Sequence, residues 1–117
     1  MQINQFEIWI ADLSLQIGTE PGKTRPVLIV QTDLLNKVSH PSTIVCPLST
    51  MVQNNSEILR VHLKKGMGNL LENCDVMIDQ ISAINNKRLV KKVGELPLEL
   101  RQVVQANIAL ILDMKLA

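Results

Sequence analysis

Aromatic side chains are almost missing from this sequence. It contains one Trp, one Phe and no Tyr, together 2% of its 117 residues, although 46% of the residues are hydrophobic. The core must therefore be aliphatic. Stacking of nucleic-acid bases on aromatic platforms is nearly excluded as a way of binding.

An excess of charge of either sign is also missing. Twelve Lys and Arg residues face eleven Asp and Glu residues, so the formal net charge is +1. No field over the whole molecule attracts polyanions. Any binding of nucleic acid must come from a local cluster of basic groups.

Cysteines and long apolar runs are few as well. Cys46 and Cys74 lack metal-ligand spacing and are too few for a disulfide scaffold, so we expect buried free thiols and neither metal nor cofactor. The most apolar stretch, residues 108–112, is far shorter than the ~20 residues of a membrane span. The N-terminus shows no signal-peptide pattern. We expect a soluble, cytoplasmic protein that does not associate with membranes.

The hydrophobic pattern predicts one domain over residues 1–117, without repeats or linkers. β-branched residues and alternation predict strands over residues 6–13, 27–30, 43–46, 59–63, 76–84 and 89–93. Pro47 is expected to end the third strand, and residues 33–41 to form a connection. In the fourth, Leu59, Val61 and Leu63 should share the buried face and Arg60 and His62 the wet face.

Near the C-terminus the spacing of apolar residues changes to three and four, which predicts a helix over residues 97–114. Its apolar face is wider than one stripe, and a partner subunit is one way to cover it. The chain therefore reads as mainly β, a small barrel or sandwich with one packed helix.

The polar loop of residues 18–24 runs directly into the second strand. Gly18 and Gly22 permit positive φ and Pro21 fixes a corner of a turn, so the loop is expected to be ordered. Pro26 biases Arg25 toward extended geometry. Arg25 is thus expected on a stiff backbone where the loop meets the strand, although a plain surface arginine is an equally good reading.

The order of several short motifs resembles the MazF/PemK family of toxins over nearly the whole chain. The motifs are Ile8-Trp9, Asp12-Leu13, Gly18-Thr19-Glu20-Pro21-Gly22, Arg25-Pro26-Val27-Leu28-Ile29, Gln31, Asp33, Pro47-Leu48-Ser49-Thr50 and Asp79-Gln80-Ile81. The resemblance implies an SH3-like barrel of the CcdB/PemK type. It also implies a homodimer with RNA crossing the subunit interface, and a cognate antitoxin whose acidic segment folds over the RNA groove.

The activity that the resemblance implies is metal-independent, sequence-selective endoribonuclease cleavage of single-stranded RNA. The 2′-OH attacks and leaves a 2′,3′-cyclic phosphate and a 5′-OH. Arg25 matches the family's catalytic arginine, and a guanidinium can clamp two phosphate oxygens. Ser49 matches the catalytic threonine and keeps its hydroxyl. Glu20 matches the loop glutamate, which acts as base or positions Arg25.

Further residues are expected to contact RNA. They are Lys23, Thr24, Thr50, Lys64, Lys65, Asp79 and Gln80. Lys87, Arg88, Lys91 and Lys92 form a second basic cluster, for which a solvated strand face is the preferred reading. His40 and His62 fall in no motif and are not expected to be catalytic.

Two departures from the family pattern keep alternatives open. Phe6 stands where the family usually has Gly, and Ser49 replaces Thr, so a degenerate toxin that only binds antitoxin is one alternative. A non-catalytic gyrase poison of the CcdB type is another. The Kid-like arrangement of acid and base is disfavoured, because Thr19 and Met77 occupy two of its three positions.

Overall fold

The computed structural model describes residues 2–13 and 23–115. In this part of the chain the elements are β1 (Glu7–Asp12), β2 (Thr24–Ile29), α1 (Asp33–Asn36), β3 (Ser42–Ser49), β4 (Arg60–Leu63), η1 (Met67–Asn69), β5 (Cys74–Met77), η2 (Ile78–Gln80), β6 (Ser82–Asn85), η3 (Asn86–Arg88), β7 (Leu89–Glu95) and α2 (Leu98–Ile111). The three η elements are 3₁₀ turns. No helix among these is long and apolar enough to cross a membrane.

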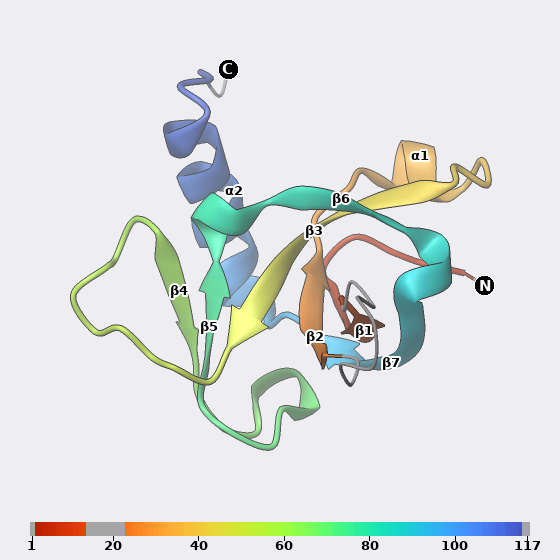
Figure 1. Cartoon of the computed structure of the whole chain (residues 1–117). Coiled ribbons are helices and arrows are strands. Elements are labelled where there is room, and N and C mark those ends of the chain that lie inside the picture. Colours follow the sequence, from red (N-terminus) through yellow and green to blue (C-terminus); the bar gives the residue numbers. More distant parts are fainter. Residues whose placement is uncertain (1, 14–22, 116–117) are drawn as a thin grey trace.

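The described strands form one bent antiparallel sheet (Figure 1), in the order β4-β5-β3-β2-β1-β7. β3 is its central member. One edge of β3 pairs with β2, while its other edge pairs with β6 through residues 42–45 and then with β5 through Leu48 and Ser49. The predicted fold class, mainly β with a C-terminal helix, is confirmed.

Two aliphatic clusters cover the two faces of the sheet. The larger cluster joins α2, through the fully buried Val104, to Leu28, Cys46, Leu48 and Val76. The smaller lies on the opposite face, and its members are Ile3, Trp9, Ala11, Val27, Ile29, Val45 and Leu89. Because strand side chains alternate between faces, Arg25 and Ser49 share the face of the smaller cluster.

Three boundaries differ from the sequence-based prediction. β2 begins at Thr24, so Arg25 and Pro26 lie inside the strand. β3 continues through Pro47 to Ser49. The expected connection after Gln31 contains the short helix α1, capped by the Thr32 side chain, which accepts from the Leu34 N–H.

The remaining differences are smaller. The predicted strand over residues 76–84 is interrupted by η2, which contacts α2 and β3. Within the predicted strand over residues 59–63, Leu59 is exposed, whereas the Arg60 side chain is only 15% exposed beside Asp75. The alternation therefore holds at Val61, His62 and Leu63 but fails at the first two positions.

Candidate active site

The candidate site lies where β1 and β3 end and β2 and β5 begin. Ala11 pairs with Arg25, and Ser49 pairs with Asp75. The β2–β3 pairing ends at Val27 with Pro47, and Arg25 and Ser49 each lie two residues beyond that pair. Because strand side chains alternate with a period of two, both project to the same face as Val27 and Pro47. Arg25 and Ser49 thus share one face at the neighbouring ends of adjacent strands.

The Ser49 hydroxyl is held by the turn that follows β3. Its Oγ accepts a hydrogen bond from the Met51 N–H at 3.1 Å. A hydroxyl has one proton to donate, and the accepted bond leaves that proton free for a ligand. Ser49 is therefore arranged as a donor toward an anion that Arg25 could also contact.

Several predicted RNA contacts lie at this same end of the sheet. Lys23 and Thr24 are exposed immediately before Arg25, and Lys64 and Lys65 are exposed in the turn after β4. Glu20 lies outside the described residues. Exposed basic groups thus stand at two places near this end of the sheet, before β2 and after β4.

Other predicted contacts are not brought to Arg25 and Ser49. Thr50 lines an apolar groove of about 470 Å³ with Ile10 and Pro26, which alternation places on the opposite face of the sheet. Asp79 and Gln80 are exposed in η2, beyond the far end of β5. Their predicted contact with RNA remains a prediction.

Two of the four residues of the second basic cluster, Arg88 and Lys92, are engaged within the protein. Lys92 Nζ lies 3.0 Å from Glu7 Oε2, and Arg88 donates to the Asp12 carbonyl at 3.1 Å. Burial alone would raise the pKa of Glu7, but hydrogen bonds from Asn4, Trp9 and Lys92 outweigh it and lower that pKa. The hydrogen bond to Glu7 raises the pKa of Lys92. These contacts support a structural role.

Both cysteines are free and buried, as predicted. Burial and the charge of Asp79 raise the pKa of the Cys46 thiol to about 12, and burial also raises the pKa of Cys74. A thiolate is the reactive form of cysteine. Neither side chain is therefore suited to nucleophilic chemistry at neutral pH.

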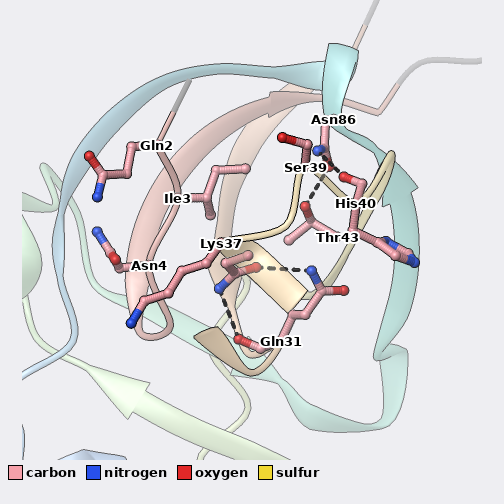
Figure 2. Close-up of a pocket in the computed structure, with 10 residues that line it drawn as sticks. Gln2, Ile3, Asn4, Gln31, Lys37, Ser39, His40, Thr43 and Asn86 are labelled. Atoms are coloured by element: carbon pink, nitrogen blue, oxygen red, sulfur yellow. Dashed lines mark hydrogen bonds between the residues drawn. The ribbon is translucent and has the colours of Figure 1, made fainter. Parts of the chain in front are cut away.

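A polar cavity of about 260 Å³ lies at the other end of β3 (Figure 2). Four of its side chains bond within the lining: Gln31 Nε2 donates to Asn36 at 2.9 Å, and Asn86 bonds both Thr43 and the His40 carbonyl. Because these partners satisfy each other, the network serves to join α1, β3 and η3.

The sequence reasoning missed one feature of the candidate site. His62 pairs with Asp75 across β4 and β5, and Nδ1 of the imidazole lies 2.5 Å from Asp75 Oδ1. The alternating pattern did place His62 on a wet face. Nothing in the sequence, however, indicated that a carboxylate lies opposite it.

Comparisons with known proteins find relatives over nearly the whole chain. The endoribonuclease EndoA of Bacillus subtilis (strain 168) is 29% identical over 115 residues, which are 95% of this chain and 98% of that protein. The MazE–MazF complex (Form-II) of Deinococcus radiodurans matches with a TM-score of 0.82 and 18% identity, over 98% of this chain and 99% of that one.

The Mycobacterium tuberculosis toxin MazF-mt6 matches with a TM-score of 0.77 and 22% identity, over 94% of this chain and 99% of that one. These likenesses confirm the predicted toxin fold. A family model described as the PemK-like, MazF-like toxin of type II toxin–antitoxin systems matches residues 4–112. The chain therefore belongs to the PemK-like, MazF-like family of toxins of type II toxin–antitoxin systems.

Proposed function

We propose that this toxin is a metal-independent, sequence-selective endoribonuclease that cleaves single-stranded RNA. Family membership and the likeness to EndoA, an endoribonuclease, support the activity. The observation that carries the proposal is that Arg25 and Ser49 share one face at the neighbouring ends of β2 and β3, with exposed lysines before β2 and after β4.

The proposed reaction uses the nucleophile that RNA itself carries. The 2′-oxygen attacks phosphorus, the bond to the 5′-oxygen breaks, and the products are a 2′,3′-cyclic phosphate and a 5′-OH. Arg25 neutralises the charge that develops on the phosphorane, and the Ser49 hydroxyl donates to one of its oxygens. Glu20 is the predicted base for the 2′-OH proton.

We also propose two macromolecular partners. A second copy of the chain would cover the outer face of α2, where Val103 and Leu110 are 42% and 58% exposed. A cognate antitoxin would cover the RNA-binding end of the sheet, as a disordered segment that folds on binding. The complex of MazF with MazE in Deinococcus radiodurans supports such a pairing.

The decisive experiment incubates the purified protein with a long single-stranded RNA in EDTA, beside the variant Arg25→Ala. Discrete cuts with cyclic phosphate ends are expected from the wild type and none from the variant, because the guanidinium would contact the reacting phosphate. Mapping the product ends gives the recognition sequence. An unchanged melting temperature and sedimentation value for the variant would show that only the chemistry was lost.

Absence of cleavage by the wild type would favour a binding module or a degenerate toxin. Cleavage by Arg25→Ala at the wild-type rate would remove Arg25 from the mechanism. Cleavage that disappears in EDTA and returns with a divalent cation would contradict the metal-independent chemistry.

A further inference from the structure

Asp75 is a carboxylate with no exposed surface beside the candidate site. Its Oδ1 faces His62 Nδ1, and its Oδ2 accepts from the Gln53 N–H at 2.8 Å. Arg60 Nη1 lies 3.5 Å from Oδ2. A carboxylate is rarely buried unless it is paired, and here the partners include two basic side chains.

The contact with Asp75 determines how His62 presents its ring. Nδ1 must carry a proton to donate to the carboxylate, so Nε2 is the nitrogen left for other contacts. Nε2 has no partner in the part of the chain that the structure describes, and the His62 side chain is 40% exposed. The imidazole is thus anchored at one nitrogen and available at the other.

The sheet register aligns this pair with the candidate site. Asp75 lies between Ser49 on β3 and His62 on β4 in one transverse row, so all three side chains project to the same face. Two strand spacings separate Ser49 from His62, roughly 10 Å between Cα atoms. A hydroxyl and an imidazole that project across such a gap can contact opposite sides of one phosphodiester group.

We propose that His62 is the general acid of the cleavage reaction and that Asp75 is its positioning residue; this inference depends on the proposed endoribonuclease function. As the P–O5′ bond breaks, its electron pair stays on the 5′-oxygen, which takes the proton from Nε2. The 2′-OH proton leaves to the base, for which Glu20 is the predicted residue. The buried carboxylate holds the ring so that Nε2 points away from Asp75.

The test uses two short RNAs that contain the mapped cleavage site. One has an ordinary scissile phosphodiester, and the other has sulfur in place of the bridging 5′-oxygen. A thiolate leaves without being protonated, so it does not need a general acid. His62→Gln is expected to slow cleavage of the ordinary RNA by about 10²–10⁴-fold and cleavage of the sulfur-containing RNA much less.

His62→Arg keeps a cation opposite Asp75 but cannot give up a proton, so it should resemble His62→Gln. His40→Gln is the matched control, because His40 lies at the far end of β3 bonded to Ser42, and it should cleave both RNAs like the wild type. Melting temperatures confirm that each variant folds.

Wild-type rates for His62→Gln, or for His62→Arg, on the ordinary RNA would overturn the assignment. Equal losses on both RNAs would also overturn it, since a general acid is dispensable only for the sulfur leaving group. Failure of the wild type itself to cleave the ordinary RNA would instead contradict the proposed function.

Discussion

Ser49 takes part in both a strand and the turn that follows it, whereas the sequence-based prediction ended that strand at Pro47. It is the last residue of β3, and its side chain also begins the turn through the bond to the Met51 N–H. The strand fixes its Cα opposite Asp75, and the turn fixes its hydroxyl. This anchoring restricts the Ser49 side chain. It therefore compensates for the absence of the methyl group on Cβ, which would restrict the rotamer of a threonine at this position.

Ser49→Ala is therefore expected to lower kcat for RNA cleavage by about 10²-fold, since it removes one donor to the developing oxyanion. Ser49→Thr keeps the hydroxyl and should retain activity. Single-turnover cleavage measures both, with Ser82→Ala on β6 as a control. An undiminished rate for Ser49→Ala would show that this hydroxyl takes no part in the chemistry.

The residues predicted for the site differ in how far sequence alone could place them. Arg25 and Ser49 could be predicted because each belongs to a motif. The contact of His62 with Asp75 could not, because it depends on the β4–β5 register, and Asp75 stands in an apolar segment between Cys74 and Val76. Local pattern shows which face a side chain takes but not what lies opposite it.

At the scale of elements, β3 explains why Pro47 did not end a strand. β6 pairs with residues 42–45 and β5 with Leu48 and Ser49, so Pro47 falls where the strand changes partners. A missing N–H costs no hydrogen bond where that edge of the strand has no partner. The exchange of neighbours was invisible in the sequence, and with it the extension of β3 to Ser49.

The contact between β7 and η1 depends on two glycines. A Cβ at Gly94 would lie 2.3 Å from the Gly68 carbonyl oxygen, and Gly68 itself has φ +56°. The Gly68 carbonyl group is part of the backbone, so it cannot move aside as the end of a flexible side chain could. The η1 turn therefore packs on β7 only because neither position carries a side chain.

Gly94→Ala should destabilise the fold by about 1–3 kcal/mol, because the methyl group overpacks this contact. Urea denaturation would measure the loss. Val90→Ala, at an exposed position of the same strand, should change stability by about 0.5 kcal/mol or less. Equal stability of Gly94→Ala and wild type would mean that η1 can move away from β7 without cost.

At the scale of the whole molecule, α2 presents two different faces. Val104 is buried against the sheet, whereas Val103 and Leu110, which are two helical turns apart, face outward. Apolar residues on the outer face of a helix commonly mark an interface between proteins. The proposed homodimer would bury them.

Leu110→Asp should weaken the proposed dimer, because a charge would be placed in an apolar interface. Sedimentation velocity would report a shift toward the monomer, while Gln102→Asp, at an exposed polar position of the same helix, should not change the sedimentation value. A dimer that persists in Leu110→Asp would place the interface elsewhere.

The pairing of β1 with β7 joins the first strand of the chain to the last. A sheet that contains such a distant pair is rich in nonlocal contacts, so its folding is slow, on the order of milliseconds to seconds. During synthesis β1 gains its second neighbour only after β7 has been made. The toxin sheet therefore cannot form completely until β7 has left the ribosome.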